Sequence, residues 1–211
     1  MASVSSMDDL GDRIITKFKE SKFGIGSTEF LPHGCLDELI TAESVTEELE
    51  IEDYPANRES KALIEFILEE AKKVFAISLI SGVTNQILRD VMASFMQHRF
   101  ADASLPIKHK EDLDTLPCFL SHTWNKRRKR DFWTKQWSFL APLFSKKQFK
   151  MELEPDHILP FIWKGSETKE SEFSQVYEVT IHESHHEDPI LTVSKRRSSR
   201  SEASCSKLFD Q

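Results

Sequence analysis

Two neighbouring apolar stripes at helical spacing constrain the fold of this chain more than any other feature. The first runs through residues 60–82 and the second through 84–100, with Gly82 and Val83 at the junction. Apolar side chains recurring every three or four positions predict amphipathic helices. So short a connection predicts that the helices pack as an antiparallel or crossed pair. The expected core residues are Leu63, Ile64, Ile67, Leu68, Ala71, Val74, Phe75, Leu79, Ile87, Leu88, Val91, Met92, Phe95 and Phe100.

The segments on either side of this pair carry weaker helical signals. Acidic residues that follow Ser6 lead into apolar positions at helical spacing, which predicts a short amphipathic helix over 7–21. Residues 22–32 contain two glycines and predict a loop, and the acidic run 37–53 is expected to hold one or two short helices. The aromatic segment 132–144 predicts a further helix that docks on the pair.

The pattern changes to alternation of apolar and polar residues near the C-terminal end. Residues 173–181 predict one strand and 190–193 a second, and together they predict a small β-hairpin. The Ser- and Arg-rich end predicts a disordered tail. The expected fold is therefore mainly α with a small C-terminal β-hairpin, α+β overall. The expected domains are a flexible N-terminus 1–6, a helical domain 7–150, a hairpin module 158–195 and a disordered tail 196–211.

Composition narrows the functional classes. The chain has 211 residues, 39% of them apolar, and a formal net charge of −7. This acidity argues against a dedicated nucleic-acid binder, because phosphate binding needs a positive surface. Cys35, Cys118 and Cys205 form no close pair, so a reducing interior fits best. No secretion signal or membrane-spanning stretch is seen. We expect a cytoplasmic protein, with the nucleus as an alternative.

Several short segments resemble protein kinases. Ile158-Leu159-Pro160-Phe161, Phe173-Ser174-Gln175-Val176-Tyr177-Glu178-Val179 and Val193-Ser194-Lys195 resemble the opening of a kinase domain. The segments 73–77, 103–107 and 136–144 resemble the helical leader that precedes the kinase domain in many filamentous-fungal kinase-like proteins. Tyr177 to His182, with His185 and His186, resembles the hairpin that follows the Gly-rich loop in that family. The resemblance covers residues 60–195 and implies a truncated kinase N-lobe.

The chemistry that this resemblance implies is incomplete. In kinases a Gly-rich hairpin covers the ATP phosphates, because a backbone without side chains can approach them closely. The three glycine positions correspond here to Lys169, Ser171 and Ser174. Lys195 stands where the ATP-binding lysine would be, or else belongs to a solvated basic tail. The catalytic loop and the metal-binding motif have no counterpart in the sequence. We therefore expect no autonomous kinase activity, no cofactor and no small-molecule substrate.

A basic run forms a second candidate site. Its residues are Lys126, Arg127, Arg128, Lys129 and Arg130, with aromatic residues on both sides. Clustered cations next to aromatic side chains suit a nuclear-import signal or a contact with RNA or phosphoinositide. The alternative is a solvated basic turn that leads into the aromatic helix, or one that the acidic segment 37–53 neutralises within the fold.

Two further patterns fit a functional site, but each also has an explanation that involves no function. His182, His185 and His186 lie close enough in sequence for a metal site, although surface exposure explains them equally well. Ser199 follows Arg196 and Arg197, a pattern typical of a phosphorylation site, although such short tracts also arise by chance.

Three functional hypotheses remain from the sequence. The leading one is a non-catalytic, kinase-related interaction or regulatory protein that binds a protein partner through its helical domain. The second is a truncated kinase fragment, either an incomplete gene product or one part of a split enzyme. The third is a nuclear factor that uses residues 126–130.

Overall fold

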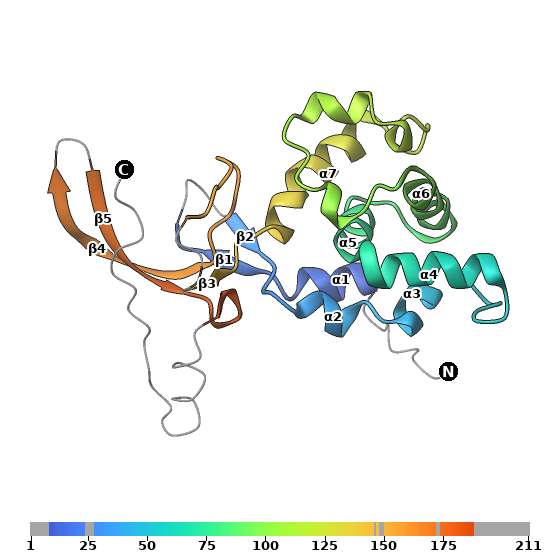
Figure 1. Cartoon of the computed structure of the whole chain (residues 1–211), viewed down its shortest axis with the longest axis horizontal. Coiled ribbons are helices and arrows are strands. Elements are labelled where there is room, and N and C mark those ends of the chain that lie inside the picture. Colours follow the sequence, from blue (N-terminus) through green and yellow to red (C-terminus); the bar gives the residue numbers. More distant parts are fainter. Residues whose placement is uncertain (1–8, 24–27, 146, 148–149, 172–173, 188–211) are drawn as a thin grey trace, which may run out of the picture. The chain divides into compact units, whose positions relative to one another are not determined.

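The chain forms two compact units that we describe separately. Their coordinates come from a computed structural model, which describes residues 9–23, 28–145, 147, 150–171 and 174–187 (Figure 1). The helical unit is built from residues 1–17 and 34–139, and the strand unit from residues 18–33 and 140–211. The fold is therefore α+β and mainly helical, as the sequence predicts. The helical domain predicted over 7–150 takes in parts of both units, because residues 18–33 and 140–150 group with the strand unit.

The helical unit contains seven α-helices and three short 3₁₀ turns among its described residues. The α-helices are α1 (Leu10–Ile15), α2 (Cys35–Leu39), α3 (Ala42–Glu48), α4 (Arg58–Glu70), α5 (Lys72–Ile80), α6 (Asn85–His98) and α7 (Lys126–Phe139). The 3₁₀ turns are η1 (Asp102–Ser104), η2 (Lys110–Asp114) and η3 (Pro117–Phe119). No described helix is long and apolar enough to cross a membrane.

The first predicted helix is in fact two helices, α4 and α5. The break lies at Ala71, where the backbone leaves helical geometry at φ −134° and ψ 24°. The carboxylate of Asp102 then accepts hydrogen bonds from the backbone N–H groups of Lys73 and Val74, both at 3.0 Å. Asp102 thus accepts hydrogen bonds from the amides at the start of α5, a role that an N-cap side chain plays in most helices. Burial raises the pKa of Asp102, while the two N–H groups lower it.

α5 is the central helix of this unit. All residues from Val74 to Leu79 are buried, and α5 contacts α1, α4, α6 and α7. An aromatic cluster lies beyond it: the Phe95 ring is 4.9 Å from Phe100 and 5.2 Å from Phe119, measured between centroids. The predicted core is confirmed at most positions. Ile87 is an exception, because its side chain is 44% exposed, and Leu68 is only half-buried.

The helix predicted over 7–21 is much shorter. α1 ends at Ile15, where the hydroxyl of Thr16 donates to the carbonyl of Arg13 at 2.8 Å. The chain then forms β1 (Lys19–Ser21), which pairs antiparallel with β2 (Thr28–Phe30). The strand β2 lies in the segment predicted as a loop. Phe30 is fully buried, so the pair is fixed by tertiary packing that the local sequence does not reveal.

The strand unit is a set of small two-stranded sheets. β3 (Phe144–Ser145) pairs in parallel with β6 (His186–Glu187), and β4 (Phe161–Ser171) pairs antiparallel with β5 (Ser174–Ile181). A 3₁₀ turn, η4 (Glu183–His185), precedes β6. A small core of Phe161, Val179 and Ile181 is covered by Phe23, Phe144, Leu159 and Tyr177.

The predicted hairpin is present but uses a different partner strand. The strand predicted over 173–181 is confirmed as β5. Its partner is β4, which precedes it, and three register irregularities interrupt the pairing. β4 carries mostly polar and charged residues after Trp163, so no apolar alternation indicated a strand. The second predicted strand, 190–193, lies outside the described residues, as do the segments 1–6 and 196–211.

Candidate functional site

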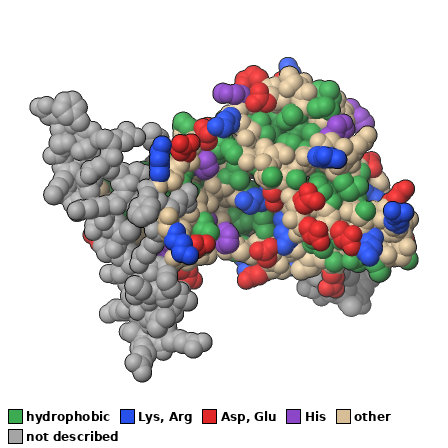
Figure 2. Space-filling model, viewed as in Figure 1, with side chains coloured by type: hydrophobic (Ala, Val, Ile, Leu, Met, Phe, Trp, Pro, Cys, Tyr) green, Lys and Arg blue, Asp and Glu red, His purple; other side chains and the backbone are tan. Residues whose placement is uncertain are grey.

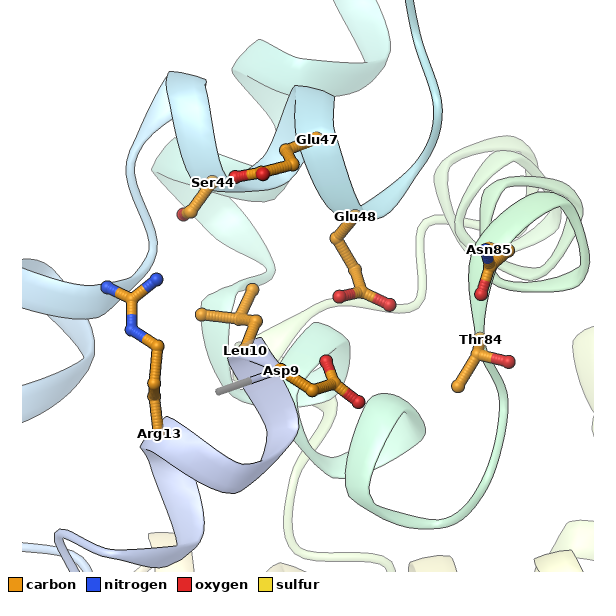
Figure 3. A pocket seen from close by; sticks show the side chains of 8 residues that line it. All are labelled: Asp9, Leu10, Arg13, Ser44, Glu47, Glu48, Thr84 and Asn85. Atoms are coloured by element: carbon orange, nitrogen blue, oxygen red, sulfur yellow. The ribbon is translucent and has the colours of Figure 1, made fainter. Parts of the chain in front are cut away.

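The candidate site is an acidic cleft on the helical unit. It has a volume of about 460 Å³ and lies where α1, the end of α3 and the start of α6 come together (Figure 3). Three carboxylates and one guanidinium line it, together with polar and apolar groups. The lining residues are Asp9, Leu10, Arg13, Ser44, Glu47, Glu48, Thr84 and Asn85.

Helix ends place the carboxylates in the cleft. Asp9 is the N-cap of α1, and its Oδ1 atom accepts from the backbone N–H of Gly11 at 3.3 Å. Glu48 is the last residue of α3, and its carboxylate accepts from the backbone N–H of Asn85, the first residue of α6. Asn85 has φ 54°, a left-handed conformation that Asn tolerates better than most residues. Glu48 therefore provides an acceptor for a backbone amide at the start of α6.

The residue at the N-cap position of α6 makes no capping bond. Thr84 is the N-cap residue, yet its side chain makes no capping hydrogen bond. The carboxylate of Glu48 supplies the acceptor instead, from a helix that ends 36 residues earlier in the chain. An acidic group at a helix N-terminus is favourable because the helix dipole is positive there.

Glu48 is the titrating group of the cleft. Burial raises the pKa of its carboxyl to about 7, and the negative charge of Asp9 and a hydrogen bond with Asp9 add to this effect. The N–H of Asn85 acts in the opposite direction. A protonated Glu48 carboxyl can donate a hydrogen bond to Asp9, which favours the protonated form of Glu48. The cleft therefore gains a negative charge as pH rises through neutrality.

The other groups of the cleft do not form a catalytic set. The hydroxyl of Ser44 accepts from the backbone N–H of Thr41 at 3.0 Å and donates to the carbonyl of Leu39 at 2.7 Å, so it is part of the cap of α3. Among the described residues, no group of three or more His, Cys, Asp or Glu side chains is arranged to hold a metal ion. The arrangement suits recognition of a cationic group, because carboxylates outnumber the single guanidinium of Arg13.

The basic run is helical, which corrects the expectation of a solvated turn. Lys126 to Arg130 form the first turn and a half of α7, and the side chain of Asn125 accepts from the backbone N–H of Arg128 at 3.0 Å. Cations in the first turn of a helix are unfavourable with respect to its dipole. An Asn side chain nevertheless caps this end, so the helix starts where the run starts.

Internal contacts divide the run into engaged and exposed cations. The ammonium of Lys129 is 2.7 Å from Asp114 and donates to the carbonyl of Leu113 at 3.0 Å, and its side chain is only 14% exposed. Arg127 and Arg130 both face Asp131, at 3.6 and 3.4 Å, yet the Arg127 side chain is 85% exposed. The neutralising carboxylates thus come from 114 and 131, and not from the segment 37–53.

Acidic and basic side chains are interspersed over the visible face of the helical unit (Figure 2). In the 37–53 segment, Asp37 pairs with Lys72, and Asp53 accepts from the hydroxyl of Ser60 at 2.7 Å. These local pairs leave no large surface of one sign in this view, which is not the pattern of a nucleic-acid interface.

The pairing of β4 with β5 places the kinase-like positions at and near one end of the ladder. Ser171 and Ser174 are register partners at the end of the ladder, and Lys169 lies opposite Val176. Near the other end, the Lys164 ammonium lies 3.8 Å from the Tyr177 ring centroid, a cation–π contact that the sequence did not indicate. Lys195 and Ser199 lie outside the described residues, so their predicted roles stay predictions.

The histidine cluster is organised by backbone contacts. His185 is buried and hydrogen-bonded to main-chain groups, whereas His182 and His186 are only partly buried. Cys118 is a free thiol, and burial raises its pKa to about 11, so this thiol stays protonated. Cys205 lies outside the described residues.

Sequence reasoning identified only one side of the cleft. Asp9 belongs to the acidic start predicted for the first helix, and that signal is local. Glu48 and Asn85 gave no signal, because their importance depends on two helix ends meeting in space. No family model matches the chain, and no curated protein or solved structure is similar to it at a significant level.

Proposed function

We propose that this protein is a non-catalytic, kinase-related interaction or regulatory protein whose helical unit binds a protein partner. The observation that supports this most directly is the acidic cleft, which is open to solvent and formed by helix ends. Two of its carboxyl groups, those of Asp9 and Glu48, bond to each other and to backbone amides. Such a lining fits a Lys or Arg side chain presented by another protein.

The sequence supports the non-catalytic part of the proposal. The positions that correspond to the phosphate-binding glycines are Lys169, Ser171 and Ser174, whose side chains would keep the backbone away from a triphosphate. No catalytic loop or metal-binding motif follows them in the sequence.

Partner binding is tested through a charge reversal at the rim of the cleft. Glu47 lines the cleft and is exposed, so Glu47→Lys should leave the fold intact. Glu69→Lys on α4 is the matched control, because Glu69 is equally exposed and lies outside the cleft. A partner recovered by cross-linking with the intact chain is purified, and its affinity for each variant is measured by calorimetry.

We expect Glu47→Lys to weaken the purified complex at least tenfold and Glu69→Lys to leave it unchanged. Equal affinity of all three proteins would contradict binding through the cleft. Phosphoryl transfer from MgATP by the purified chain would contradict the non-catalytic part instead, so the two failures are distinguishable.

A second candidate function is the kinase fragment. The observation in its favour is the β4–β5 pairing, whose ladder ends at Ser171 and Ser174, two of the positions that correspond to the glycines of the nucleotide loop. A fragment that retains this role should bind nucleotide. Because a ligand raises the melting temperature according to its concentration relative to Kd, a thermal-shift titration with millimolar MgATP separates the two candidates. We expect no shift.

A further inference from the structure

His185 joins three segments of the strand unit that are far apart in sequence. Its Nδ1 atom lies 3.0 Å from the carbonyl oxygen of Pro142. Its Nε2 atom lies 3.1 Å from the backbone nitrogen of His33 and 3.3 Å from the carbonyl oxygen of Leu31. The side chain is 2% exposed, so these main-chain groups take the place of water.

The partners determine the protonation state of the ring. A carbonyl oxygen can only accept, so Nδ1 carries a proton and donates it to Pro142. The backbone N–H of His33 can only donate, so Nε2 accepts and carries no proton. The ring in this arrangement is therefore neutral.

A proton on Nε2 is incompatible with this arrangement. The His33 N–H and the new Nε2–H would point at each other across 3.1 Å, and the His33 bond would be lost. The carbonyl of Leu31, already 3.3 Å from Nε2, is the acceptor that the new proton would find. The ring thus has two mutually exclusive sets of partners, which is the requirement for a two-state switch.

The surroundings favour the neutral ring. Burial lowers the pKa of His185 below its ordinary value, while the carbonyls of Pro142 and Leu31 raise it. Positive charge on His182 or His33 lowers it further. The ring of Phe30 lies edge-on at 5.2 Å, and those of His182 and His33 lie at 6.1 and 6.4 Å between centroids. These two histidines are the titratable groups whose charges act on His185, and Glu183, in the same turn, is exposed.

We propose that His185 is an acid-responsive clamp, which holds the His33 amide and the Pro142 carbonyl while its ring is neutral and releases the His33 amide when the ring takes up a proton. The segments it holds lie next to two of the points where the chain passes between its units. His33 is the last residue before Gly34, and Leu140 begins the strand unit two residues before Pro142. Acid release therefore frees the backbone N–H of His33, next to the first of these junctions.

The test measures His185 and the His33 amide on the full-length chain between pH 5 and 8. The ring is followed through its Cε1–H resonance by NMR. The amide is followed by hydrogen exchange, corrected for the intrinsic effect of pH. We expect the pKa of the ring to lie below 6.5. As pH is lowered, the protection factor of the His33 amide should fall by up to about tenfold for each pH unit, between the pKa of the ring in the released state and its pKa in the clamped state.

Two variants separate the clamp from general acid sensitivity. His185→Gln offers no titrating group and should abolish the pH dependence of His33 protection. His157→Gln is the control, because His157 is a partly buried histidine of the same unit whose Nδ1 accepts from the Glu154 N–H at 2.7 Å. It should leave the dependence unchanged. Protection of His33 that persists while the His185 ring titrates would overturn the proposal, and this result is readable in the unmodified chain even if His185→Gln does not fold.

Discussion

Gln136 on α7 binds the backbone of Ile107 with both ends of its amide. Its Oε1 atom accepts from the Ile107 N–H at 2.8 Å, and its Nε2 atom donates to the Ile107 carbonyl at 2.9 Å. The Gln136 side chain is fully buried, and its amide satisfies two backbone groups of the connector after η1. This pair of bonds fixes the connector to α7 as a neighbouring strand would.

Removing the Gln136 side-chain amide should lower the free energy of unfolding. Gln136→Ala leaves the buried N–H and carbonyl of Ile107 without partners, at about 1–3 kcal/mol for each group. We expect a loss in the free energy of unfolding on the order of 2–5 kcal/mol, measured by urea denaturation with fluorescence detection. Gln97→Ala, at an exposed position of α6, should change stability by less than about 0.5 kcal/mol. A similar effect of the two substitutions would show that the amide bonds do not hold the connector.

The helix pair provides a second test, because α6 carries adjacent residues of opposite burial. Leu88 and Phe95 are fully buried, whereas Ile87 is 44% exposed. Leu88→Ala or Phe95→Ala should each lower the free energy of unfolding by about 2–5 kcal/mol, since each leaves a cavity. Ile87→Ala should cost well under 1 kcal/mol. Comparable losses at Ile87 and Leu88 in thermal and urea unfolding would contradict the packing of α6.

Local patterns explain which parts of this fold the sequence predicts. Leu88 and Phe95 could be assigned to the core because helical periodicity needs only neighbours within a few residues. The break at Ala71 could not be predicted, since the cap that starts α5 comes from Asp102, about thirty residues later in the chain. β4 was missed because its residues after Trp163 are polar, and its pairing depends on backbone bonds with β5.

In the candidate site, too, some residues can be predicted from local sequence and others depend on how the helices pack. Asp9 lies in an acidic helix start that the sequence shows directly, whereas Glu48 and Asn85 become neighbours only when α3 and α6 pack. The basic run was recognised as a cluster, but its helical state depends on the Asn125 cap, and the pairing of Lys129 depends on Asp114 in η2.

Glu48 should make stability depend on pH in an unusual direction. Its pKa is about 7 in the folded chain against 4.5 for an ordinary Glu, so between these values the folded state holds a proton that the unfolded state has lost. The contribution of Glu48 to stability is therefore present below about pH 4.5 and is lost as pH rises towards 7. Glu48→Gln lacks the pH-dependent contribution of Glu48 to the free energy of unfolding. The variant should therefore be more stable than the unmodified chain at pH 8.

The measurement is the urea midpoint at half-unit steps from pH 4.5 to 8. Glu47→Gln serves as the control, because Glu47 lines the same cleft but is exposed. Its profile should follow that of the unmodified chain. A Glu48→Gln profile parallel to the unmodified one over this whole range would show that Glu48 titrates normally.

The basic run gives the last prediction, on location in the cell. The structure divides the run: Lys129 is held by Asp114 and Leu113, while Arg127 and Arg130 are exposed and Lys126 lies with them on the surface. Asp114 and Asp131 offset part of its charge, and a helical run with an inward-held lysine does not offer five cations to one receptor. We therefore expect the run to act as a solvated helix start in a cytoplasmic protein.

Replacing Lys126, Arg127 and Arg130 by Ala, in a fusion too large to diffuse through nuclear pores, should leave the distribution of the fusion in the cell unchanged. Lys129→Ala should instead lower the melting temperature, because the carbonyl of Leu113 and the carboxylate of Asp114 lose their partner. Nuclear enrichment that disappears in the triple variant, with an unchanged circular dichroism spectrum, would establish the run as an import signal and favour the nuclear alternative.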